Sequence, residues 1–193
     1  RSLVGSEMCI RDRRYGFVMG GGKPEGAFVP KKEDVVPPCA VKTLPVQDGD
    51  VFDLGGVQIE AIAVPGHTVG TMVYLDRARR VLYSGDACNA NTLLGLPCST
   101  TVETYAKSLD HLATYLKGID KFYGGHGLQA VPAYIVDEAM ILCEEILSDD
   151  DDRFETEFLG RKFLYARKFD GMFHREDGGI ANIAYVMEKV YNK

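Results

Sequence analysis

The sequence lacks the features that would direct it to nucleic acid or a membrane. It has 22 Lys and Arg against 28 Asp and Glu, a formal net charge of −6, and its basic residues form no stripe. This balance argues against nucleic acid or an anionic membrane surface as the main partner. No apolar run approaches the roughly 18 residues that a membrane-spanning helix needs. We therefore expect a globular domain whose partner is a small-molecule substrate.

The sequence also lacks any paired arrangement of cysteines. Its five cysteines include no CxxC pair: Cys9, Cys39, Cys88, Cys98 and Cys143. An odd number of scattered cysteines excludes both a disulfide framework and a thiolate zinc site as the expected arrangement. The cysteines predict buried free thiols in a reducing compartment, which favours a cytoplasmic protein.

The chain of 193 residues is long enough for one domain with its own core. Its first residues, RSLVGSEMCIRDR, resemble translated sequencing-adaptor DNA, so we expect 1–13 to be a non-native scar. A genuine N-terminus without regular structure is the alternative. Residues 14–50 are rich in Gly, Pro and charge, which is typical of loop. We expect 14–193 to be a single, partial domain.

Regular strand patterns begin after Asp50. Residues 51–54 and 57–64 flank Gly55-Gly56 and predict a hairpin. Further strands are expected at 71–75 and 81–83, and short links between them favour a mostly antiparallel sheet. The alternation in the second strand predicts that one face is lined by Val57, Ile59, Ala61 and Ala63.

Two helices and some shorter strands follow. Thr100 and Glu103 have the spacing of a capping box, and apolar residues at helical spacing continue from there to Gly118, which can end a helix. Pro132 suits the first turn of a second helix that runs to about residue 147. A strand is expected at 119–123, and the runs 162–169 and 181–186 can pair at an edge. The fold class is therefore α/β (α+β), with helices flanking the sheet.

Three of the expected strands end in the same way. Glycine and then a metal-capable side chain follow each one, as Gly66-His67, Gly85-Asp86 and Gly125-His126. Neutral imidazole nitrogen and carboxylate oxygen are good ligands for zinc and similar divalent metals. A single histidine is more often structural than a ligand, but three such residues in matching settings predict one joint metal site.

The motifs around these residues resemble a known family. PGHTVGT at 65–71, SGDA at 84–87 and GGHG at 124–127 occur in the order seen in the second half of the metallo-β-lactamase-fold hydrolases. The resemblance covers about residues 50–147 and implies part of an αββα sandwich. It also implies that His67 and His126 each bind one of two metals and that Asp86 bridges both.

The activity that the resemblance implies is hydrolysis at two metals, zinc or alternatively iron. Metal-bound hydroxide would attack an ester-, thioester- or lactone-like small molecule, with Asp86 holding the metal pair together. β-Lactams and phosphodiesters remain open as alternative substrates. Further candidates for the pocket rim are Asn89, Asn91, Thr92, Leu93, Tyr105 and Phe173.

The family's HxHxDH motif, which supplies the remaining ligands, is absent from the sequence. The other two histidines, His111 and His174, are expected to be structural or exposed. We therefore expect a truncated sandwich that is nearly inactive as written, with an exposed sheet face that promotes self-association. A non-catalytic binding module of the same fold and a di-iron redox relative remain alternatives. A serine hydrolase is disfavoured because there is no GxSxG motif.

Overall fold

The computed structural model describes residues 44–126, 129–158, 161–170 and 174–192. Contacts divide the chain into two units, residues 1–45 and 46–193, and every element below lies in the second unit. The predicted scar, Cys9 and Cys39 lie outside the described residues. Helices and strands occur together as expected, which confirms the mixed α and β class.

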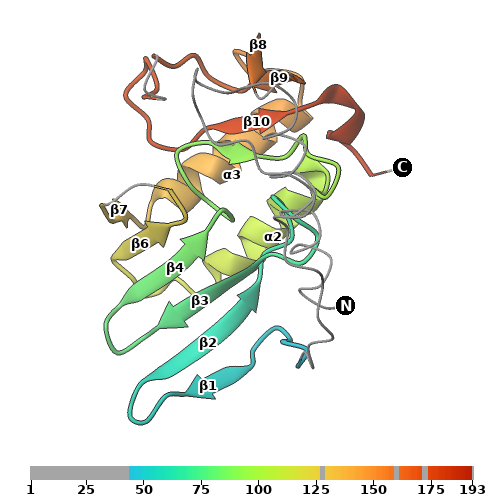
Figure 1. The fold of residues 1–193 in the computed structure, drawn as a ribbon. Coiled ribbons are helices and arrows are strands. Elements are labelled where there is room, and N and C mark those ends of the chain that lie inside the picture. The colour runs from blue at the N-terminus through green and yellow to red at the C-terminus, as the bar shows by residue number, and fades with distance from the viewer. Residues whose placement is uncertain (1–43, 127–128, 159–160, 171–173, 193) are drawn as a thin grey trace, which may run out of the picture. The chain divides into compact units, whose positions relative to one another are not determined.

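A six-stranded sheet forms the larger layer, with strand order β1-β2-β3-β4-β6-β7 (Figure 1). Its strands are β1 (Val51–Asp53), β2 (Gln58–Ala63), β3 (Met72–Asp76), β4 (Val81–Gly85), β6 (Lys121–Gly124) and β7 (Val131–Pro132). Strands β4 and β6 pair in parallel, while the other neighbours are antiparallel. The parallel pair follows from the helix between them, since a parallel connection must cross back over the sheet. The predicted hairpin and mostly antiparallel sheet are confirmed.

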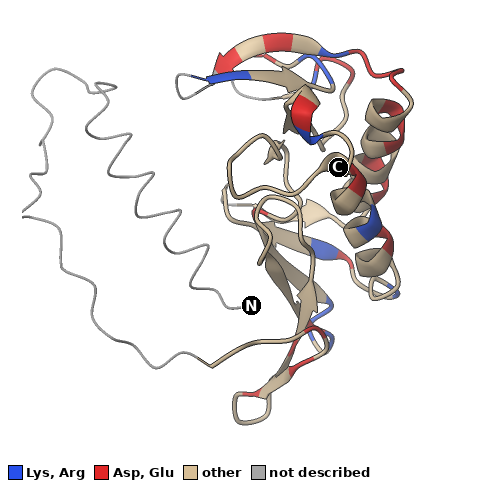
Figure 2. Ribbon diagram, turned by 90° about the vertical axis from the view of Figure 1, so that its right-hand side faces the viewer, with Lys and Arg blue, Asp and Glu red and all other residues tan. Residues whose placement is uncertain are grey.

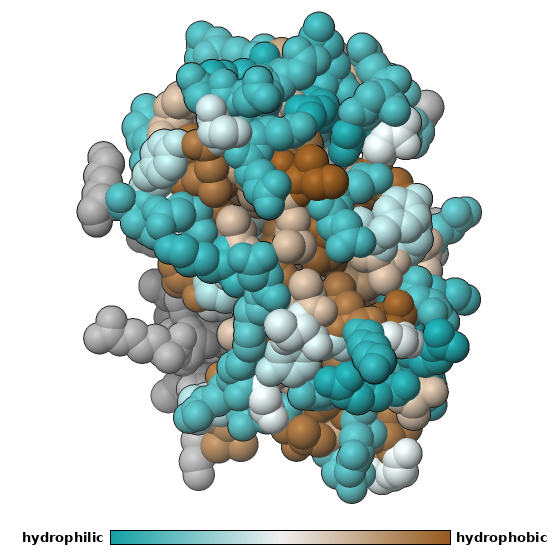
Figure 3. Space-filling view, turned by 180° about the vertical axis from the view of Figure 1, so that it is seen from behind, coloured by the Kyte–Doolittle hydropathy of each residue, from teal (hydrophilic) through white to brown (hydrophobic). Residues whose placement is uncertain are grey.

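Helices α2 (Val102–Ala113) and α3 (Ile135–Leu147) lie on one face of this sheet (Figure 1). Figure 2 shows acidic and basic residues along the outer sides of the helices. Seen from behind, hydrophilic side chains cover much of the surface, with hydrophobic ones between them (Figure 3). The inward sides of helices and sheet share one apolar core, which includes Ile62, Val73, Leu82, Leu109, Phe122 and Leu142. No helix in the described part of the chain is long and apolar enough to cross a bilayer.

The predicted helix ends need correction. The N-cap of α2 is Thr101, one residue later than expected, and its side chain accepts a hydrogen bond from Thr104 N. Glu103 binds Lys107 and the backbone N of Asn192 instead of closing a capping box. The helix ends at Ala113, before Gly118.

The start of α3 was also predicted too early. The helix begins at Ile135, and Pro132 belongs to strand β7, whose Val131 pairs with Phe122. Proline suits a helix start, but it also suits the end of a short edge strand because it has no N–H to donate.

The predicted face of β2 is the one turned away from the helices, because Ala61 lies in register with Tyr74. On this face Ala61 is buried, and Ile59 and Ala63 are half-buried. Ile62 and Val64, on the other face, join the core under the helices. Among residues 59–64 only Glu60 is polar, so both faces of the strand carry apolar side chains. The alternation of residue types therefore could not show which face packs against the helices.

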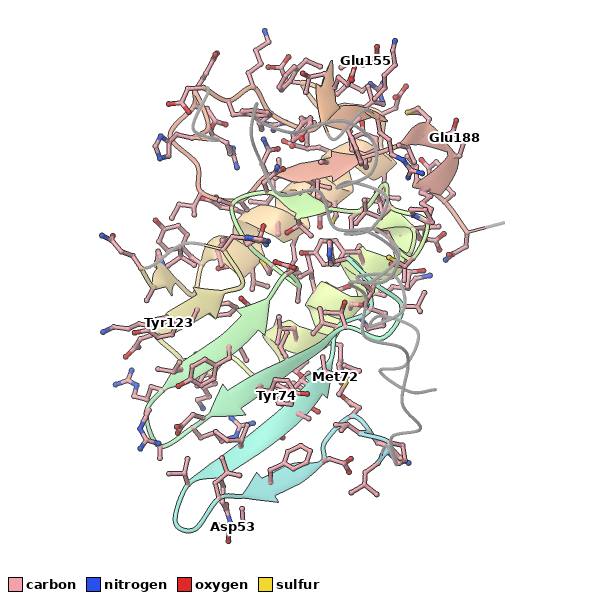
Figure 4. All side chains as sticks on the ribbon, viewed as in Figure 1. Asp53, Met72, Tyr74, Tyr123, Glu155 and Glu188 are labelled. Carbon is pink, nitrogen blue, oxygen red and sulfur yellow. The ribbon has the colours of Figure 1, made fainter. Side chains whose placement is uncertain are left out.

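The opposite face of the sheet carries a row of tyrosines. Tyr74, Tyr83 and Tyr123 lie in register on β3, β4 and β6, and the last two stack with ring centroids 5.9 Å apart. Figure 4 shows Tyr74 and Tyr123 on the side of the sheet turned away from the helices. Tyr83 and Tyr123 remain 43% and 40% exposed. This exposed sheet face is the surface through which we expect two copies of the chain to associate.

A second, four-stranded sheet has the order β5-β10-β9-β8. Its strands are β5 (Thr92–Leu93), β8 (Phe154–Phe158), β9 (Arg161–Tyr165) and β10 (Ile183–Tyr185). The predicted pairing of the two late runs is confirmed, because β9 and β10 are antiparallel neighbours. Strands β5 and β8 were not predicted. The parallel pairing of β5 with β10 ties the loop after β4 to the C-terminal part of the chain.

Two cysteines and one acidic side chain are buried inside the fold. Cys88 and Cys143 are free thiols and are buried, as expected. In the acidic run 149–152, the Asp151 side chain is fully buried, and its Oδ2 accepts a hydrogen bond from the Tyr185 hydroxyl.

Candidate metal site

His67 lies in a turn that follows β2. The turn is fixed from the segment before α2: Thr100 N donates to Gly66 O at 2.9 Å, and Ser99 Oγ donates to His67 O at 2.8 Å. The His67 ring is fixed as well, with Nδ1 3.0 Å from Leu93 O. These bonds hold both the backbone and the imidazole of His67 in place.

Asp86 lies in the turn after β4. Gly85 has a φ of +53°, in the left-handed region that glycine adopts without strain, and its carbonyl accepts a hydrogen bond from Gly125 N at 2.8 Å. A Cβ at position 125 would lie only 2.7 Å from Asp86 Oδ1. Glycine is therefore needed at 125 because the carboxylate of Asp86 occupies the space of a side chain there.

The structure brings all three predicted site residues together. Asp86 Oδ1 lies 3.2 Å from His126 Nε2, and Asp86 Oδ2 lies 3.8 Å from His67 Nε2. The side chains of His67, Asp86 and His126 are 16%, 35% and 82% exposed, so the group opens to solvent on the His126 side. Each carboxylate oxygen thus faces a different imidazole.

A hollow of about 320 Å³ adjoins this group. It is lined by His67, Asp86, Asn89, Ala90, Asn91, Leu93 and His126. The predicted rim residues Asn89, Asn91 and Leu93 are therefore confirmed, whereas Thr92 is buried and outside the lining. The volume is at the lower end of the range for small-molecule sites, roughly 300–1,000 Å³.

The hydrogen bond at Nδ1 determines what His67 offers to Asp86. A carbonyl oxygen only accepts, so Nδ1 carries the hydrogen and neutral Nε2 keeps its lone pair. Nε2 then faces Asp86 Oδ2, which is also an acceptor when ionised. Two acceptors turned toward each other favour a positive charge between them, which either a proton on Nε2 or a divalent metal ion supplies.

The donor types fit a metal, but their number is small. Two imidazoles and one carboxylate suit zinc. Within the described ranges, however, no group of three or more His, Cys, Asp or Glu side chains is arranged so that it could hold a metal ion. The distances place one imidazole opposite each carboxylate oxygen of Asp86. The described residues therefore offer donors of a type that suits a metal, but they do not form a complete metal site.

Asn89 orients the carboxylate of Asp86. Asn89 Oδ1 accepts a hydrogen bond from Asn91 N at 2.8 Å, which turns Asn89 Nδ2 toward Asp86 Oδ1 at 3.5 Å. The sequence predicted only that Asn89 lies on the rim of the pocket. Its orienting role depends on the hydrogen bond from Asn91 N to its side-chain oxygen, which the sequence did not reveal.

Tyr105 was a predicted rim residue, and this was wrong. It is fully buried beneath the two turns, because the apolar face of α2 points into the core. Phe173 lies outside the described residues.

The two remaining histidines are away from the site, as expected. His111 Nε2 lies 3.0 Å from Asp48 Oδ2, and its ring packs edge-on against Tyr115. His174 is exposed and pairs with Asp170.

Comparison with known families decides the relationship. A model of the metallo-beta-lactamase superfamily matches residues 11–153, about three quarters of the chain. The chain belongs to the metallo-β-lactamase superfamily. The family predicted from the three short motifs is thus confirmed, and the fold of the described residues is consistent with it.

Relatives within this superfamily include two named hydrolases. Acyl-coenzyme A thioesterase MBLAC2 of Bos taurus is 31% identical over 86 residues, 44% of this chain and 31% of that protein. Hydroxyacylglutathione hydrolase of Brucella anthropi is 35% identical over 101 residues, 50% of this chain and 36% of that protein. The chain spans about a third of the length of these curated relatives.

Solved structures of the superfamily are also similar. A metallo-beta-lactamase family protein from Thermus thermophilus has 21% sequence identity and a TM-score of 0.47, covering 73% of this chain and 47% of that one.

Proposed function

We propose that this chain belongs to a metal-dependent hydrolase that cleaves acyl thioesters. The observation that carries the proposal is the convergence of His67 and His126 on the two oxygens of Asp86 beside a hollow. The substrate class is supported by the relatives. Coenzyme A and glutathione are both thiols, so their acyl derivatives are thioesters.

In this proposal, His67, Asp86 and His126 hold the metals, with zinc preferred by the donor set. When bound, such metals lower the pKa of water toward about 7 and polarise the substrate carbonyl. Asp86 would offer one carboxylate oxygen on the side of each imidazole, and Asn89 Nδ2 holds the orientation of that carboxylate. Leu93 and Ala90 provide apolar surface for the acyl part of the substrate.

We also propose that the complete centre takes further ligands from outside the described residues. The HxHxDH motif is absent, and three donors shared between two metals leave most coordination positions to other groups. Zinc binding by this chain is then weak, and its turnover is far below that of a complete site.

The test is thioester hydrolysis by the purified chain in millimolar zinc, followed by release of free thiol from a short-chain acyl-coenzyme A. We expect slow turnover that falls at least 100-fold in Asp86→Asn. Asp110→Asn, which changes an exposed carboxylate on α2, should keep the rate of the unmodified chain. A β-lactam and a phosphodiester are offered in parallel.

Two results would count against the proposal. One is turnover that Asp86→Asn leaves intact, and the other is faster cleavage of the β-lactam or the phosphodiester than of the thioester.

A non-catalytic binding module is the second candidate, favoured by the lack of a complete metal-holding group among the described side chains. It predicts that acyl-coenzyme A binds without any turnover that depends on Asp86. Metal analysis of the protein purified without added metal separates zinc from iron and so tests the redox alternative.

A further inference from the structure

Tyr105 lies directly beneath the His67 turn. It is a residue of α2 and has no exposed surface. A Cβ at position 66 would lie 2.3 Å from Tyr105 Cδ2 and 2.9 Å from Cε2. The ring therefore packs against the backbone of Gly66, the residue immediately before His67.

The other end of the same side chain reaches the Asp86 turn. The Tyr105 hydroxyl donates to Ala87 O at 2.7 Å, and Ala87 is the residue immediately after Asp86. Ala87 is fully buried, so this carbonyl is shielded from water. Burial raises the pKa of Tyr105 well above its usual value, which keeps the hydroxyl protonated as a donor.

The Tyr105 side chain thus contacts a residue adjacent to His67 with its ring and a residue adjacent to Asp86 with its hydroxyl. His67 Nε2 and Asp86 Oδ2 lie 3.8 Å apart, a separation that depends on how the two turns sit relative to each other. We propose that Tyr105 is a positioning residue that sets the separation of His67 and Asp86, with its ring fixing one turn and its hydroxyl fixing the other. The inference rests on the proposed function, because it concerns the same metal-binding residues.

Removing the hydroxyl separates the two roles. Tyr105→Phe keeps the ring against Gly66, so the packing of α2 is preserved. It leaves the buried Ala87 carbonyl without its donor, which frees the Asp86 turn to shift. Residues that orient metal ligands typically contribute 10- to 100-fold to metal affinity. We expect a zinc affinity about 10-fold weaker in Tyr105→Phe.

Tyr185→Phe is the matched control. Tyr185 is also fully buried, and its hydroxyl also makes a 2.7 Å hydrogen bond, in this case to Asp151 Oδ2. Both variants therefore lose one buried hydrogen bond, and Tyr185→Phe should lose at least as much stability in urea because its partner is a carboxylate. Only Tyr105→Phe should weaken zinc binding, measured by competition with a fluorescent chelator. Equal zinc affinity in Tyr105→Phe and the unmodified chain would overturn the proposal, as would an equal loss in Tyr185→Phe.

A metal-free measurement separates this inference from the proposed function. Histidine ring signals in nuclear magnetic resonance spectra of the zinc-free chain report the surroundings of each imidazole at fixed pH. Tyr105→Phe should move the His67 signals and leave those of His111 unchanged, while Tyr185→Phe should move neither.

If zinc does not bind at all but the His67 signals move, the positioning role stands and the metal function fails. If zinc binds and depends on Asp86 but the His67 signals do not move, the metal function stands and the positioning role fails.

Discussion

Gly66→Ala tests the tight packing between the His67 turn and α2. The added methyl group would lie 2.3 Å from Tyr105 Cδ2, whereas ordinary carbon contacts begin near 3.5 Å. The turn or the ring must therefore move by about 1 Å. The ring is fully buried and cannot rotate into solvent.

Overpacking of a well-packed core costs about 1–3 kcal/mol, and a clash of this size against a buried ring belongs at the upper end. We expect a loss of about 3 kcal/mol. For a protein of this size that corresponds to about 6–12 °C in melting temperature. Gly70→Ala is the control, because its methyl group would meet nothing within 4 Å and should change stability by at most about 0.5 kcal/mol.

A double-mutant cycle in urea locates the cause. Tyr105→Ala alone should cost about 3–5 kcal/mol by leaving a cavity. In that background Gly66→Ala no longer has a ring to meet, so its further cost should fall to about 0.5 kcal/mol or less. If Gly66→Ala is as stable as Gly70→Ala, or if its cost persists without the ring, the packing described here is refuted.

Three further predictions concern acid stability, metal binding and association. The hydrogen bond from Arg79 holds the pKa of nearly buried Asp76 below its usual value, so Asp76 stabilises the fold above about pH 4, and this contribution is lost as pH falls through the lower folded pKa. Urea midpoints should show Asp76→Asn less stable than the unmodified chain at pH 7, with the difference shrinking as the pH falls below about 4. A difference that stays constant with pH would contradict this. Calorimetric titration with zinc should show weak binding, and two tight equivalents would show that this chain needs no further ligands. Tyr123→Lys should reduce concentration-dependent association in sedimentation experiments, and a strictly monomeric unmodified chain would refute a role for the exposed sheet face.

The convergence of the three donors could be predicted from the sequence because each follows a strand and a glycine. Strands β4 and β6 are parallel neighbours, so Asp86 and His126 emerge at the same edge of the sheet. His67 follows β2, which runs in the same sense because β3 lies antiparallel between β2 and β4. Chain direction and turn chemistry thus determine this part of the site.

Other features depend on tertiary partners that local patterns do not reveal. Thr100 and Thr101 are adjacent hydroxyl residues, and Glu103 is used by Lys107 and Asn192, so the capping pattern pointed to the wrong residue. Strand β5 has two residues and exists only because β10 pairs with it. The helical spacing of Tyr105 predicts burial, but it cannot show that the ring reaches two different turns.

The pairing of β5 with β10 has a consequence for protein engineering. Leu93 O, which fixes the His67 ring, belongs to a two-residue strand whose hydrogen-bonding neighbour is the segment at Ile183, some ninety positions downstream. Shortening the tail past Ile183 would therefore remove the support for an imidazole anchor far away in sequence. Tags and truncations intended to improve expression are better placed beyond Asn192, because its backbone N donates to the Glu103 side chain in the first turn of α2.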